Sequence, residues 1–300
     1  MKRRLTWIAP IVGAVGLLSG LVPVASASVT NGQIVFVRSS GAGAGIYVAD
    51  PDGSNAHALP VPVDGQGPTW SPDGSRITYS APIAGQGSAI WVVNADGTDP
   101  HVVADTPSLD IVPKWSPDGS RISFNADFGG GLPNYEVFIA MADGSGYSQF
   151  THTDPSETAS TWSPDGSSLA FFRGRSLITA PISGDGDGTV VTTFAKGATV
   201  TSPSWSPDGS TFVFLQGRTT GENWDVARIS VTGKSLKRLT RDKLPDGDPT
   251  WSPDGASILW GRVVGGEGQI WRMDADGANQ VAITTPGSGS FDFSPDQETA

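Results

Sequence analysis

The sequence contains no cysteine and only three histidines, His57, His101 and His152. Without cysteine the chain cannot form a disulfide, and it has no thiol to which a lipid could be attached. It also has no H-E-x-x-H motif and no paired-histidine spacing, so we expect neither a zinc centre nor a histidine-bound manganese centre. The G-x-S-x-G elbow of the α/β-hydrolases is absent too. We therefore expect no enzymatic activity and no cofactor.

Basic residues are also scarce, with 19 Lys and Arg against 30 Asp and Glu and a formal net charge of −11. Proteins that bind nucleic acid or anionic lipid surfaces need a basic surface that neutralises phosphate groups. The charge balance therefore argues against both kinds of partner.

Residues 1–27 have the pattern of a secretory signal peptide. Three basic residues, Lys2 to Arg4, precede an uncharged apolar run up to about Val24, and Ala25-Ser26-Ala27 follows as a small-residue cleavage site. We predict cleavage after Ala27 and export to the periplasm, the cell-envelope space or the exterior, which would leave a net charge of −14. The alternative is a membrane anchor, because the apolar run is about 20 residues long. Glycines within the run favour cleavage and a soluble mature protein.

Glycine and proline are abundant, with 39 and 23 copies, and many of them belong to one repeated phrase. The pentapeptide WSPDG occurs five times at intervals of 43 to 47 residues, and a decayed copy, FSPD, closes the series. A period of about 40 to 50 residues is typical of a four-stranded propeller blade. The copies begin at Trp70, Trp115, Trp162, Trp205, Trp251 and Phe293.

Each SPDG segment has the composition of a tight turn. Proline fixes φ at the second turn position, aspartate bonds to local backbone groups, and glycine adopts the left-handed conformation. An alternating strand follows each turn, with apolar residues two positions apart, such as Ile77 and Tyr79. We predict that the aromatic residue before each turn, including Phe293, packs in the core between neighbouring sheets.

The two ends of the chain look like the parts of one blade. Residues 33–60 resemble a second, third and fourth strand with no preceding WSPDG, and the segment 291–296 resembles a first strand with no successors. Pairing the two fragments would close the ring and leave no open sheet edge. We therefore predict an all-β, six-bladed propeller over residues 28–300, with the N-terminal strands paired to the C-terminal strand.

The repeat carries a family resemblance. The pattern P-x-W-S-P-D-G-x-x-I-x-F, followed by I-Y-V-x-D-x-D-G and R-L-T, resembles the WD-like "PD" repeat of the TolB β-propeller family over residues 31–296. The resemblance implies a propeller fold. TolB itself has an α/β domain before its propeller, for which residues 28–300 leave no room, so a TolB-type role in an outer-membrane complex is not expected.

Candidate binding residues lie in the loops that vary from one repeat to the next. An acidic residue precedes the first strand in four repeats, and Val200 and Ser288 occupy the corresponding offset in two others. We predict a ring of carboxylates at the mouth of a central channel, which would attract a cationic segment or a divalent cation. Ordinary solvated loop charge is the alternative. The predicted ring and its flanking aromatic residues are Asp64, Asp110, Glu157, Asp246, Phe128, Tyr135 and Trp224.

These observations together predict an exported, monomeric, non-enzymatic scaffold that binds a protein or peptide at the cell envelope. The alternative is a glycan lyase or hydrolase that works from the propeller funnel with carboxylates alone. Aspartate-rich turns such as Asp50-Pro51-Asp52-Gly53 faintly resemble calcium loops. Hairpin geometry explains these turns, and weak calcium binding stays open as an alternative.

Overall fold

The computed structural model describes residues 31–39, 44–61, 65–83, 87–127, 134–154, 156–218, 224–287 and 290–299. These residues form strands and turns and contain no helix, so the all-β prediction is confirmed for them. The same ranges accordingly include no helix long and apolar enough to cross a membrane. The predicted leader, residues 1–27, lies outside the described residues.

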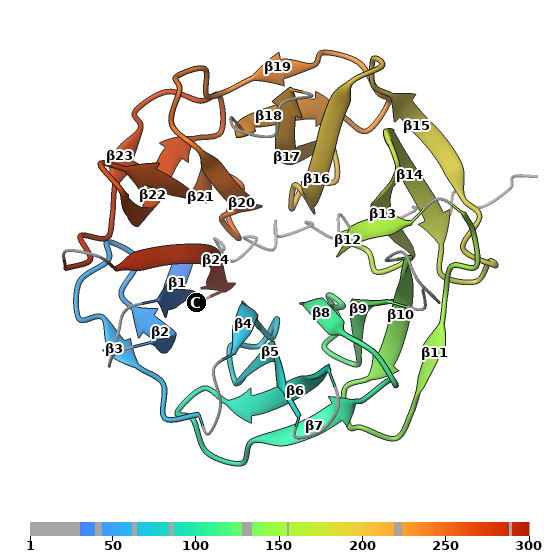
Figure 1. Cartoon of the computed structure of the whole chain (residues 1–300), viewed down its shortest axis with the longest axis horizontal. Helices are drawn as coiled ribbons and strands as arrows, with labels where there is room; N and C mark the ends of the chain where they lie inside the picture. The colour runs from blue at the N-terminus through green and yellow to red at the C-terminus, as the bar shows by residue number, and fades with distance from the viewer. Residues whose placement is uncertain are drawn as a thin grey trace, which may run out of the picture.

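The strands form small sheets arranged around a central axis, as in a propeller (Figure 1). Four sheets have four strands each, and the neighbouring strands within each of them are consecutive in sequence. These sheets consist of β4 (Gln66–Trp70), β5 (Arg76–Pro82), β6 (Ser88–Asn94) and β7 (His101–Ala104); β8 (Asp110–Trp115), β9 (Arg121–Asp127), β10 (Tyr135–Met141) and β11 (Tyr147–Gln149); β12 (Glu157–Trp162), β13 (Ser168–Arg173), β14 (Ser176–Pro181) and β15 (Thr189–Thr193); and β16 (Ala198–Trp205), β17 (Thr211–Arg218), β18 (Trp224–Ser230) and β19 (Lys237–Arg238).

The remaining eight strands form one sheet, which differs from the six separate blades predicted. It contains β20 (Asp246–Trp251), β21 (Ser257–Val264), β22 (Glu267–Asp274), β23 (Val281–Ala282), β24 (Phe291–Thr299), β1 (Asn31–Ser39), β2 (Gly45–Ala49) and β3 (His57–Ala58). The C-terminal strand β24 pairs with the N-terminal strand β1 in antiparallel register. A single parallel pair, Gly268 with Phe291, joins β22 to β24 and makes the sheet continuous.

The SPDG turns have the predicted chemistry. In the first copy the Gly74 amide donates to the Ser71 carbonyl at 2.9 Å, and Gly74 is left-handed with a φ of 67°. The Asp73 carboxylate accepts hydrogen bonds from the Ser71 hydroxyl at 2.6 Å and the Ser75 amide at 3.1 Å. These bonds favour the ionised carboxylate and lower the pKa of Asp73 to about 2. Aspartate is therefore a structural part of the turn.

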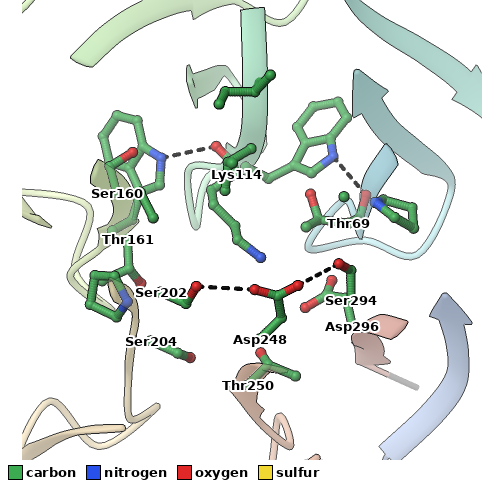
Figure 2. A pocket seen from close by; sticks show the side chains of 18 of the residues that line it. Thr69, Lys114, Ser160, Thr161, Ser202, Ser204, Asp248, Thr250, Ser294 and Asp296 are labelled. Atoms are coloured by element: carbon green, nitrogen blue, oxygen red, sulfur yellow. Dashed lines mark hydrogen bonds between the residues drawn. The ribbon is translucent and has the colours of Figure 1, made fainter. Parts of the chain in front are cut away.

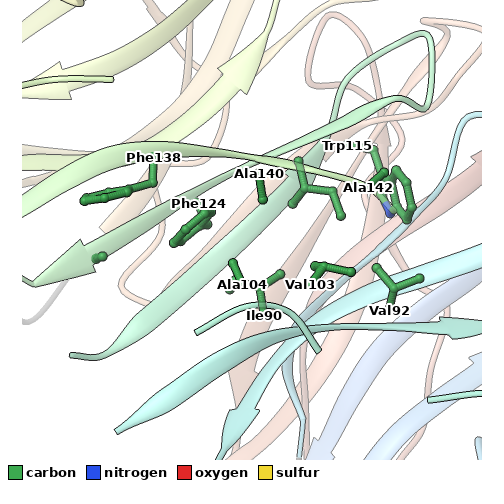
Figure 3. Close-up of a cluster of buried hydrophobic side chains, with 11 residues drawn as sticks. Ile90, Val92, Val103, Ala104, Trp115, Phe124, Phe138, Ala140 and Ala142 are labelled. Carbon is green, nitrogen blue, oxygen red and sulfur yellow. The ribbon is translucent and has the colours of Figure 1, made fainter. Parts of the chain in front are cut away.

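The core lies between neighbouring sheets, and the tryptophans before the turns fill it. Trp115 belongs to a buried cluster that also contains Val92 and Val103 of the preceding sheet and Phe124 and Ala142 of its own sheet, and it lies at the end of this cluster beside Ala142 (Figure 3). Four of the five tryptophans are buried, and Trp205 is half-buried against Phe212 at 4.6 Å between ring centroids. The predicted core role of these tryptophans is confirmed.

The prediction for Phe293 is wrong, because the FSPD segment is not a turn. Residues 291–299 form one continuous strand, β24, in which Phe293 is half-buried and Phe291 is exposed. Gln297 pairs with Ile34 as Trp251 pairs with Ile258, so Gln297 occupies the tryptophan position. Phe293 therefore lies four residues before the tryptophan position of its blade, and the FSPD segment belongs to the strand and not to the turn after it.

Candidate functional site: the central cavity

Six strands line the centre of the ring, and a repeated irregularity shapes all of them. Each has a residue in the left-handed region three positions before the tryptophan or its equivalent, with φ between 38° and 56°. The ladder skips a residue beside each one, as in a β-bulge. A proline follows in five strands, which a strand tolerates only at a sheet edge or bulge. The left-handed residues are Gly67, Val112, Ala159, Ser202, Asp248 and Ser294.

The six strands enclose a cavity of about 620 Å³. This volume lies within the range of about 300 to 1,000 Å³ that is common for small-ligand sites. The residue directly before the tryptophan position faces the cavity in each strand, and four of these six residues carry hydroxyl groups. They are Thr69, Lys114, Thr161, Ser204, Thr250 and Asp296, and Figure 2 labels all of them.

Some of these side chains also tie neighbouring sheets together. The Thr161 hydroxyl accepts a hydrogen bond from the Trp205 amide at 3.2 Å, and the Ser204 hydroxyl accepts one from the Trp251 amide at 3.4 Å. At the junction of β24 and β4 the Asp296 carboxylate does the same for the Trp70 amide, at 2.8 Å. Burial raises the pKa of Asp296, while the nearby Lys114 ammonium and the Trp70 amide oppose this effect.

The predicted acidic ring is not exposed at the channel mouth. Asp110 and Glu157 are 0% exposed and Asp246 is 5% exposed, because each begins an innermost strand and points into the protein. Glu157 accepts a hydrogen bond from Arg173 Nε at 2.6 Å, and Asp246 accepts one from Arg262 Nε at 2.7 Å. These carboxylates pair with the second strand of their own sheet.

Asp110 has no arginine partner. Its carboxylate accepts hydrogen bonds from the Thr106 amide at 2.8 Å and the Thr106 hydroxyl at 2.5 Å. Burial nevertheless dominates and raises the pKa of Asp110 to about 6.

At the two ends of the chain, the position five residues before the tryptophan position does not hold the residue that the sequence predicted. In β24 the corresponding position holds Asp292, which pairs with Arg38 at 2.6 Å, and not Ser288. Just before β4 the corresponding position, five residues before Trp70, holds Gly65 and not Asp64, and Gly65 is buried against Ile46 and Tyr79. Asp64, Phe128 and Ser288 themselves lie outside the described residues. Val200 occupies the offset in β16 as expected and is buried.

Tyr135 and Trp224 have different surroundings. Tyr135 begins β10, is half-buried and lines the cavity, and its amide donates to the Ser156 hydroxyl at 2.8 Å. Trp224 begins β18 and packs against the core cluster to which β17, β18, β20, β21 and β22 contribute. The structure thus brings Tyr135 and Glu157 to the cavity wall and leaves Trp224 away from it.

A second buried carboxyl group, Glu136, lies beside Glu157 and was not predicted. The Thr151 hydroxyl donates to Glu136 at 2.6 Å and lies 3.1 Å from Glu157, so one hydroxyl group contacts both carboxyl groups. Burial and the adjacent Glu157 carboxylate raise the pKa of Glu136. The described residues contain no group of three or more potential metal ligands, and we find no metal site among them.

Sequence reasoning missed the polar residues at the centre of the cavity, Lys114, Asp248 and Asp296. All three lie in the x-Pro-x segments that precede the tryptophan positions. Aligning the five copies that have this proline would have found them, because they are the only charged residues on either side of it.

A comparison of the sequence with models of known protein families gives a match that agrees with the repeat and with the arrangement of the sheets. The model of the TolB β-propeller domain matches residues 25–285. The chain belongs to the TolB β-propeller family. A Tol-Pal system protein TolB from Novosphingobium aromaticivorans is 39% identical over 70 residues, which is 23% of this chain and 15% of that protein. The match to this TolB-family relative therefore spans a small part of its length.

Solved structures share the fold. The crystal structure of TolB from Acinetobacter baumannii has a TM-score of 0.75 at 22% identity, covering 89% of this chain and 66% of that chain. A puromycin hydrolase has a TM-score of 0.57 at 17% identity, covering 87% of this chain and 47% of that chain. At these identities the likeness concerns the fold alone.

Proposed function

We propose that this TolB-family propeller is a non-enzymatic scaffold that binds a protein or peptide partner in the cell envelope through the open end of its central cavity. Family membership supports a protein partner, since the curated relative belongs by name to the Tol-Pal system. The central cavity is the observation that supports the proposal most strongly. It is large, open and lined by hydroxyl groups, carboxylates and one lysine contributed by six strands.

We further propose that the propeller has six blades, with the eight-stranded sheet counted as two. The join between β22 and β24 is a single residue pair, whereas β24 and β1 pair along their length. β24 also has the left-handed residue of all the other innermost strands, the following proline that four of them have, and a buried acid paired to arginine as in β12 and β20. It would act as the first strand of the closing blade.

The proposed location rests on the leader pattern in residues 1–27 and on the family. Cleavage after Ala27 would deliver a monomeric propeller of residues 28–300 to the envelope space. Measuring the intact mass of the protein recovered from its native culture tests this directly, because a retained leader would raise the mass by that of 27 residues.

Partner capture tests the function. Wild-type protein, a Gln66→Trp variant and a Thr193→Trp variant would be used to capture proteins from the native envelope fraction. Gln66 is exposed and lines the cavity, so tryptophan there should obstruct the cavity and abolish capture without disturbing the core. Thr193 is exposed on the outer strand β15 and serves as the matched control. Equal capture by all three proteins would contradict a cavity-centred interface.

A carboxylate-based glycan lyase or hydrolase is the second candidate. The observation that favours it is the presence of two carboxyl groups in one cavity, Asp248 and Asp296, in different surroundings. Hydrolysis of glycosides commonly uses such an acid and base pair. Turnover of a polysaccharide by the wild type that disappears in Asp296→Asn would replace the binding proposal with this one.

A further inference from the structure

Three charged side chains from three strands share the interior of the cavity: Lys114 on β8, Asp248 on β20 and Asp296 on β24. Figure 2 shows the Lys114 amino group extending into the cavity toward Asp248. No carboxylate oxygen of the described residues lies within 4.0 Å of the Lys114 amino group. The cavity therefore contains a cation and two anions that do not neutralise one another by direct contact.

Asp248 is fixed in place, with hydrogen-bonding capacity to spare. Its two oxygens accept hydrogen bonds from the Ser202 hydroxyl at 3.0 Å and the Ser294 hydroxyl at 2.6 Å (Figure 2). Each carboxylate oxygen has two lone pairs, so each can accept another donor. All three residues have left-handed backbones and occupy the same position in the repeated bulge of three innermost strands, which places Asp248 between the two serines.

The cavity wall also carries buried polar atoms without partners. Asn125 is 1% exposed and lines the cavity, and its amide group donates to the Glu157 carbonyl at 3.2 Å. Its Oδ1 atom has no hydrogen-bond partner among the described residues, and neither does Trp70 Nε1. Buried polar groups in proteins nearly always have a partner. Both atoms are covered by protein, so the accessible polar groups of the cavity are Lys114, Asp248 and the hydroxyl groups.

We propose that the central cavity binds a small zwitterion of the α-amino acid class, with the ligand carboxylate at Lys114 and the ligand ammonium at Asp248. A purely anionic ligand would satisfy Lys114 but would face two aspartates, and a purely cationic ligand would face Lys114. A neutral polyol could use the hydroxyl groups but would leave Lys114 and Asp248 without a direct ionic contact. A molecule with both charges satisfies both sides of the cavity.

This site concerns a small ligand and stands apart from the protein partner proposed above. A chain that captures a protein but binds no amino acid would contradict only this inference. Conversely, amino acid binding without protein capture would contradict only the scaffold proposal.

Titration of the wild-type protein is the first test. Trp70, Trp115 and Trp162 line the cavity, so tryptophan emission and calorimetry can both follow occupation. We expect saturable binding of at least one member of a panel of α-amino acids, and none of putrescine, succinate or sorbitol. The inference is overturned if no amino acid binds up to millimolar concentrations, or if one of the three other probes binds equally well.

Two variants assign the charges. Lys114→Met keeps the length of the side chain and Asn tolerates the left-handed backbone at position 248. Each of Lys114→Met and Asp248→Asn should weaken amino acid binding about tenfold or more, because a hydrogen bond to a charged group contributes about 1.5 to 3 kcal/mol. The exposed controls Lys196→Met and Asp276→Asn should leave binding unchanged. Wild-type affinity in Lys114→Met would refute the assignment.

A measurement on the wild type keeps the inference testable if either variant fails to fold. Acetylation of lysines, quantified by peptide mass spectrometry, should be slower at Lys114 in the presence of the bound amino acid and unchanged at Lys196. Equal acetylation of Lys114 with and without the amino acid would show that the ligand lies elsewhere.

Discussion

Replacing Asp110 with asparagine should stabilise the protein near neutral pH, although it removes a carboxylate from a hydrogen-bonded position. The aspartate is fully buried at the start of β8, and its pKa is raised to about 6 by that burial. Asparagine can replace its contacts, because Oδ1 can accept from the Thr106 amide and Nδ2 can donate to the Thr106 hydroxyl. The variant keeps the hydrogen bonds and loses the buried charge.

The direction in which the stability changes with pH follows from proton linkage. Because the folded state holds the Asp110 proton more tightly than the unfolded state, the stability contributed by this group is complete below about pH 4 and declines as the pH rises toward 6. A pKa that rises from 3.8 to about 6 corresponds to a loss of about 3 kcal/mol. Asp110→Asn cannot titrate, so its advantage over wild type should grow across this window and level off above it.

Urea unfolding followed by tryptophan fluorescence, at a series of pH values from about 4 to about 8, measures this difference in the free energy of unfolding. Asp73→Asn is the contrasting control, since the pKa of Asp73 is lowered and its loss should destabilise the protein at neutral pH. Parallel pH profiles for wild type and Asp110→Asn would refute the reasoning. They would mean that Asp110 is solvated, as the acidic-ring hypothesis supposed.

Three further predictions concern the ring and its turns. Removing residues 288–300 should abolish cooperative thermal unfolding, because β24 pairs with β1 along its length, and a melting temperature equal to wild type would contradict this. Gly53→Ala should lower stability more than Gly119→Ala: both glycines are left-handed, but the new Cβ would overlap the backbone carbonyl oxygen of Ile283 in the first and would lie 3.8 Å from its nearest atom in the second. Equal losses, near the roughly 1 to 2 kcal/mol of the left-handed backbone alone, would argue against that clash. Glu136→Gln should reduce the decline in stability as the pH rises toward neutrality, since burial raises the pKa of Glu136, and an unchanged pH profile would show that its carboxyl group is not desolvated.

The repeated strands and turns could be predicted because their causes are local. Proline, aspartate and glycine at fixed turn positions, and alternating apolar residues after them, specify a hairpin without reference to the rest of the chain. The same local chemistry also indicates that the FSPD segment of β24 is not a turn. Gln297 follows Asp296 where every true turn has glycine, and glutamine at that position cannot easily adopt the left-handed conformation that Gly74 has.

The buried acids were harder to predict because their surroundings come from other strands. In the sequence, an acidic residue near a loop looks like an ordinary surface charge. Only the pairing with Arg173 or Arg262 on the adjacent strand shows that Glu157 or Asp246 points inward. A spacing of sixteen residues between acid and arginine recurs in both sheets and was the available signal. The pair between Asp292 and Arg38 joins opposite ends of the chain, so no local pattern could reveal it.

Site-specific photo-crosslinking in the native envelope tests the binding scaffold most directly. A photoreactive phenylalanine analogue would replace Tyr135, which lines the cavity, and in a second variant Leu236, which is exposed on the outer side near β19. We expect a discrete protein adduct from position 135 and none from position 236. Adducts from position 236 alone would contradict a partner bound at the central cavity.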